Sequence, residues 1–129
     1  MEKAKHANYV RKSDEFERAA RDSAARGDWD AAVANAVHSG ISMADAMAVF
    51  YLGKRSAAQD HEESASLLMQ LTIDRKGIER ASSHLTQLLQ VKSAAEYEER
   101  LLGPGDSATA LKHLERFKVW ARGKLPARY

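Results

Sequence analysis

An arginine and a histidine with the chemistry to act on a phosphate lie near each other in the middle of the sequence. Arg55 and His61 are separated by five residues in the run GKRSAAQDHEES. A guanidinium binds phosphate and stabilises charge that develops on it, and an imidazole takes up and releases protons, so such a pair needs no metal ion. Strongly helical sequence flanks the run, and a turn after Gly53 would let the two side chains converge.

A purely structural interpretation of the same residues stays open. Lys54 and Arg55 are cations at the end of a predicted helix, where they complement the helix dipole. His61 is then a solvated side chain in the first turn of the next helix.

Four polar residues share one face of the helix that precedes the pair. Asn35, His38, Ser42 and Asp45 follow one another at steps of three, four and three residues, with apolar residues on both sides. Burying polar groups without partners is costly, so these side chains need a role. They either form hydrogen bonds within the fold or line a cleft or a subunit interface.

The composition is that of one soluble globular domain covering residues 1–129. Hydrophobic residues make up 44% and charged residues 29% of the chain, and cysteine is absent, which excludes disulfides and thiolate chemistry. A formal net charge of +2 does not by itself indicate nucleic-acid binding. Neither a signal peptide nor a membrane-spanning run is found, so we expect a cytoplasmic protein without a membrane partner.

Apolar residues recur with the helical period almost throughout, which predicts an all-α, up-and-down bundle of four to five helices. The expected elements are a first helix at residues 3–25 within an N-terminal segment 1–27, a second at 29–52, a third starting between 56 and 60, a fourth after a break at 74–77, and a last one before Pro126. The first has a weak apolar side of Val10, Phe16, Ala20 and Ala24. The second is apolar on all sides, which predicts a central position.

The start and the charge of the last helix can also be predicted. Gly103, Pro104 and Gly105 indicate a loop, after which Asp106 or Ser107 would cap the helix. Its basic residues, and those of the short basic tail 126–129, indicate a solvated helix end or a weak phosphate-contacting patch. They are Arg116, Lys118, Arg122, Lys124 and Arg128.

The five histidines, one per predicted helix, raise the possibility of a metal site inside a bundle. No two of them, and no Glu and His, share the spacing that fixes two metal ligands on one helix turn. We therefore expect most histidines at the surface, no metal site, and no cofactor, since phosphate-binding and dinucleotide-binding glycine motifs are missing as well.

The segments WDAAVANAVHSGISMADAM, LGKRSAAQDHEE, LLQVKSAAEYEE and LERFKVWARGKL, spread over residues 29–125, resemble the HEPN-domain family (higher eukaryotes and prokaryotes nucleotide-binding), in particular its small stand-alone bacterial members. The resemblance implies an α-helical bundle. The signature of catalytic members is an Arg followed, after four to six residues, by a His, which Arg55 and His61 match. The residue after the arginine is often Asn, Asp or His in that family, whereas this chain has Ser56.

The resemblance implies a metal-independent endoribonuclease of the toxin or defence kind, acting as a homodimer whose two Arg–His pairs face each other. His61 would then be the acid or base, Arg55 would hold the scissile phosphate, and Asn35, His38, Asp45 and Ser56 would support the pair or contact RNA. An antitoxin protein is a further implied partner. The alternative is a non-catalytic HEPN module that binds a nucleotide or a nucleotidyltransferase-like protein.

Overall fold

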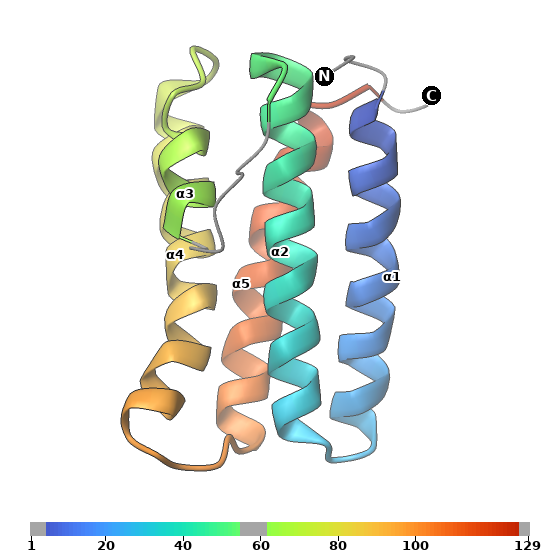
Figure 1. Cartoon of the computed structure of the whole chain (residues 1–129), viewed down its shortest axis with the longest axis vertical. Coiled ribbons are helices and arrows are strands. Elements are labelled where there is room, and N and C mark those ends of the chain that lie inside the picture. The colour runs from blue at the N-terminus through green and yellow to red at the C-terminus, as the bar shows by residue number, and fades with distance from the viewer. Residues whose placement is uncertain (1–4, 55–61, 127–129) are drawn as a thin grey trace.

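The computed structural model describes residues 5–54 and 62–126, which form five helices and no strand. The helices are α1 (His6–Ala25), α2 (Trp29–Leu52), α3 (Glu62–Leu68), α4 (Arg75–Tyr97) and α5 (Pro104–Gly123). The four long helices lie side by side, and the short α3 lies against α4 (Figure 1). The predicted all-α fold is confirmed. No helix of this described part has both the length and the apolar character needed to cross a membrane.

α2 is the central helix of the bundle, as its apolar residues on all sides predict. It packs against α1, α3, α4 and α5 (Figure 1), and it is buried almost continuously from Ala32 to Val49. It ends at Gly53, which has φ +71° and whose N–H donates to the carbonyl of Val49 at 3.1 Å. Glycine adopts this left-handed conformation without a steric penalty, so it ends the helix.

Small residues let the backbone of α2 approach its neighbours closely. On the α1 side, the Ser13 hydroxyl donates to the Ser39 carbonyl at 2.8 Å and the Ser39 hydroxyl donates to the Ser13 carbonyl at 2.7 Å. On the opposite side, a Cβ at Gly40 would stand 2.6 Å from the side chain of Leu88. The two serines are fully buried, and the paired bonds satisfy both hydroxyls.

α1 is joined to α5 through a buried lysine. Lys118 is 3% exposed, and its ammonium lies 2.9 Å from a carboxylate oxygen of Asp14 and 2.7 Å from one of Glu17. Burial alone would raise the pKa of Glu17, but the bonds from Lys118 and Arg21 outweigh it and lower that pKa. Arg122 also pairs with Asp14. The prediction of a solvated helix end is therefore wrong for Lys118, which is buried against acids of α1, whereas Arg122 is exposed as well as paired.

The predicted break at residues 74–77 is the capped start of α4. Asp74 accepts from the Gly77 N–H at 3.2 Å, from the Trp120 indole at 3.0 Å and from the Lys124 ammonium at 3.2 Å. The bond from Trp120 is the main reason why the pKa of Asp74 is lowered. A Cβ on Gly77 would lie 2.4 Å from the indole nitrogen, so only glycine leaves room for this junction with α5.

The start of α5 differs from the prediction. The helix begins at Pro104 rather than after Asp106 or Ser107, so the expected loop at Gly103, Pro104 and Gly105 is shorter than predicted. Proline suits the first helical position because its fixed φ is helical and it has no N–H to satisfy. Asp106, in the first turn, accepts from the Gly103 N–H at 2.8 Å and is paired with Arg100.

The ion pairs of Lys118 predict that a triple variant is more stable than the double variant it contains. Asp14→Asn with Glu17→Gln should lower the free energy of unfolding by about 3 kcal/mol, because a buried ammonium loses both counter-charges. Adding Lys118→Met to this pair should restore stability to within about 1 kcal/mol of the parent, since no buried charge is left. Urea denaturation measures all three. A triple variant as unstable as the double variant would contradict this account of the α1–α5 contact.

Candidate functional site

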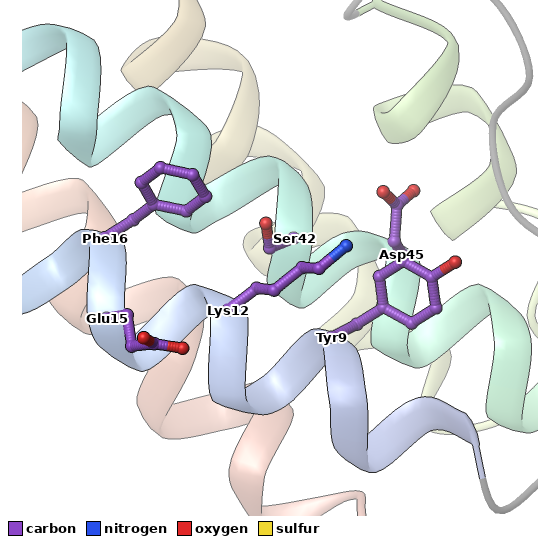
Figure 2. Close-up of a pocket in the computed structure, with 6 residues that line it drawn as sticks. All are labelled: Tyr9, Lys12, Glu15, Phe16, Ser42 and Asp45. Atoms are coloured by element: carbon purple, nitrogen blue, oxygen red, sulfur yellow. The ribbon is translucent and has the colours of Figure 1, made fainter.

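A pocket of about 410 Å³ lies between α1 and α2, along the half of α2 that ends at Gly53. This volume is within the range of small-molecule sites in proteins. Its lining residues are Tyr9, Lys12, Glu15 and Phe16 from α1, and Ser42 and Asp45 from α2 (Figure 2).

Helical spacing brings these side chains together. Tyr9, Lys12 and Phe16 are three and four residues apart and therefore share one face of α1, while Ser42 and Asp45 are three apart on α2. The serine contact between the helices lies within the same stretch of α1. Since that contact sets the spacing of the two backbones, it also sets the width of the pocket.

The pocket combines a cation, aromatic rings and a mostly buried carboxylate. Lys12 is exposed, and its ammonium lies 5.4 Å from the centroid of the Tyr9 ring, within the range of a cation–π contact. Figure 2 shows the Lys12 side chain extending between Ser42 and Tyr9 towards the turn of Asp45. Asp45 is 8% exposed and has at least one interaction partner of its own. Such a surface offers a donor, an acceptor and stacking faces to one ligand.

The polar face predicted on α2 divides into two parts. Asn35 donates from its side-chain amide to the Ala31 carbonyl at 2.9 Å, which is a bond within its own helix. His38 is exposed and its ring lies on that of Phe16, with centroids 5.3 Å apart and an angle of 33°. His38 thus extends the aromatic wall of the pocket, whereas Asn35 is oriented by its own backbone. Ser42 and Asp45 line the pocket.

Arg55, Ser56 and His61 lie outside the described residues, so the Arg–His pair stays a prediction. The described part ends at Lys54, directly after the cap of α2. Asp45 precedes Gly53 by about two helical turns. The pocket is therefore on the helix that leads directly into Arg55.

Two histidines meet where the sequence indicated surface positions. His84 of α4 and His113 of α5 have their Nδ1 atoms 2.9 Å apart, and His113 is 6% exposed. His6, at the start of α1, is also buried. Residues 5–54 and 62–126 contain no group of three or more His, Asp or Glu side chains placed to hold a metal ion.

The α1 half of the pocket escaped the sequence analysis. Tyr9, Lys12 and Glu15 do not fit an apolar stripe, and Phe16 is indicated only as part of a weak apolar side. The spacing of Tyr9, Lys12 and Phe16 on one face was the available signal. It becomes informative only once α1 is known to pack on the polar face of α2.

Comparisons of the chain with protein-family models, with curated proteins and with solved structures found no match. The functional argument therefore depends on the residues themselves.

Two serines one turn apart on α2 test whether the pocket is open space. Ser42→Leu should change the free energy of unfolding by less than about 1 kcal/mol, because the larger side chain extends into the pocket. Ser39→Leu should cost about 3 kcal/mol or more, because it removes the paired bonds and forces the backbones of α1 and α2 apart. Thermal or urea unfolding compares them. Equal losses for the two variants would show that the residues around Ser42 leave no room.

Proposed function

We propose that the protein is a metal-independent endoribonuclease in which Arg55 and His61 act on the scissile phosphate and the α1–α2 pocket holds the adjoining RNA. The observation that carries the proposal is the pocket itself, in which an ammonium and aromatic rings of α1 face a buried carboxylate of α2, the helix that precedes Arg55. The resemblance of the sequence around Arg55 and His61 to catalytic HEPN domains is the second support.

The proposed reaction is an internal phosphoryl transfer. His61 takes the proton from the ribose 2′-hydroxyl, and the 2′-oxygen attacks the adjacent phosphorus. The bond from phosphorus to the 5′-oxygen breaks, and protonated His61 returns its proton to that oxygen, which leaves a 2′,3′-cyclic phosphate and a free 5′-hydroxyl. Arg55 stabilises the negative charge that develops on the phosphate oxygens. No step requires a metal ion.

The pocket residues have chemistry that suits single-stranded RNA. Proteins hold unpaired bases by stacking them on aromatic rings, for which Tyr9, Phe16 and the adjoining His38 are available. The Lys12 ammonium is placed to contact a backbone phosphate. Asp45 accepts hydrogen bonds only, so it would favour a base edge that presents N–H groups or would orient the catalytic pair.

A homodimer with two facing Arg–His pairs and an antitoxin protein are parts of the same proposal. The alternative function is a non-catalytic module that binds a nucleotide or a nucleotidyltransferase-like protein. The same pocket favours this alternative, because it offers nucleotide contacts whether or not cleavage occurs.

Cleavage of single-stranded RNA in the presence of EDTA tests the proposal. The parent protein should cut RNA under these conditions, and Arg55→Ala and His61→Ala should each reduce the rate by about 100-fold or more, as expected for a transition-state contact and for a general acid or base. Circular dichroism should show unchanged helicity.

The matched control is Arg18→Ala, which removes an exposed arginine from α1 outside the pocket and should leave cleavage unchanged. Cleavage that survives both Arg55→Ala and His61→Ala would contradict the nuclease. If the parent does not cleave RNA but nucleotides raise its melting temperature, the alternative module is supported.

A further inference from the structure

The histidine pair between α4 and α5 shares a single proton position. The Nδ1 atoms of His84 and His113 are 2.9 Å apart, the ring centroids are 5.2 Å apart, and the ring planes meet at 39°. The rings therefore meet nitrogen to nitrogen rather than face to face. An N–H···N bond has room for one hydrogen, so one ring donates from Nδ1 and the other accepts there. A second proton on Nδ1 would break this bond.

The surroundings of the pair disfavour added positive charge. Burial lowers the pKa of His84, and the charges of Arg116 and Lys112 lower it further. Burial also lowers the pKa of His113, followed by the effects of His84, Lys112 and Arg116. The rings thus remain neutral to a lower pH than exposed histidines.

Among the described residues, the cations beside this pair have no ion-pair partner, unlike the other cations on α5 and the lysine that follows it. Lys118, Arg122 and Lys124 are all paired with carboxylates. Lys112 and Arg116 lie one helical turn apart, are exposed, and form no ion pair with any residue of the described ranges.

The other groups around the pair do not alter this charge balance. On α4, Arg80 stands one turn before His84 and adds a third cation without an ion pair among the described residues. The carboxylates nearest along the two helices, Glu79 and Glu115, are exposed and pair with none of these cations. On the inner side, α2 contributes Gly40 against leucines of α4 and α5, which brings no charge. The acids of α1 that reach α5, Asp14 and Glu17, are both paired with Lys118.

We propose that this seam between α4 and α5 is a binding site for a phosphate group, in which Lys112 and Arg116 contact the phosphate oxygens and the His84–His113 pair takes up a proton when the anion binds. The anion supplies the missing counter-charge, so the energetic cost of a further positive charge on the imidazoles falls. By linkage, a lower pH must then tighten anion binding. The site is separate from the α1–α2 pocket and does not depend on the nuclease proposal.

NMR titration of the imidazole signals of the full chain tests the proposal. The probe is sulfate, which has the shape of phosphate but keeps its charge between pH 5 and 8, compared with potassium chloride at equal ionic strength. Sulfate should raise the apparent pKa of the pair by about half a unit more than chloride does, as expected for a nearby opposite charge. Sulfate affinity should rise about threefold as the pH falls through the same range.

Two charge-removing variants separate a site from general screening. Lys112→Gln with Arg116→Gln should raise the pKa of the pair without any anion and should abolish the response to sulfate. Arg75→Gln with Lys76→Gln removes the same charge from the exposed first turn of α4 and should leave the sulfate response unchanged. His84→Gln with His113→Gln should keep sulfate binding but remove its pH dependence, because no imidazole is then left at the seam.

A short oligouridylate distinguishes the source of the phosphate. A shift with both sulfate and the oligonucleotide supports a contact to a nucleic-acid backbone, and a shift with sulfate alone supports a site for a free phosphate group. No shift beyond chloride, or an unchanged shift in Lys112→Gln with Arg116→Gln, overturns the proposal whatever the oligonucleotide does.

Discussion

The contact between α1 and α5 depends on the buried ammonium of Lys118, which holds Asp14 and Glu17 of α1. α1 buries only two apolar residues, Tyr9 and Ala20, beside the polar His6, Ser13 and Ser23. Hydrophobic burial is therefore a weak source of stability for this helix compared with α2. The ion pairs from Lys118 to Asp14 and Glu17 and the serine bonds to Ser39 define its position instead. These contacts are directional, so they fix the rotation and height of α1 more strictly than an apolar stripe would.

The position of α1 in turn creates the pocket. One side of α1 directs Asp14 and Glu17 towards α5, and another places Tyr9, Lys12 and Phe16 opposite α2. A rotation of α1 about its axis would disturb both sides together. The structural ion pairs and the candidate site are thus coupled through one rigid helix, although they share no residue.

Much of the fold could be predicted from the sequence because it depends on local signals. The bounds of α2 follow from its periodicity and from Gly53, and the central position follows from its apolar residues on all sides. The start of α5 was misplaced because the Gly103–Pro104–Gly105 run has two uses. Proline and glycine often break helices, but proline is also favoured at a first helical position.

The sites were less predictable because they depend on partners far apart in the sequence. Whether Lys118 is solvated or buried is decided by Asp14, which lies 104 residues away. His84 and His113 are on different helices, so no helical spacing links them in the sequence, and their contact arises only when α4 packs on α5. Asp45 and Ser42 were found because a polar face on an apolar helix is visible in one segment. The α1 residues that line the same pocket were not found, because they form no polar or apolar face that can be seen in the sequence of α1 alone.

The central functional claim is that RNA bases enter the pocket between α1 and α2. Ultraviolet cross-linking of single-stranded RNA to the full chain, followed by mass spectrometry of the linked peptides, tests it most directly. We expect cross-linked peptides from α1 that contain Tyr9 or Phe16. Efficient cross-linking confined to other helices, with none on α1, would contradict the account.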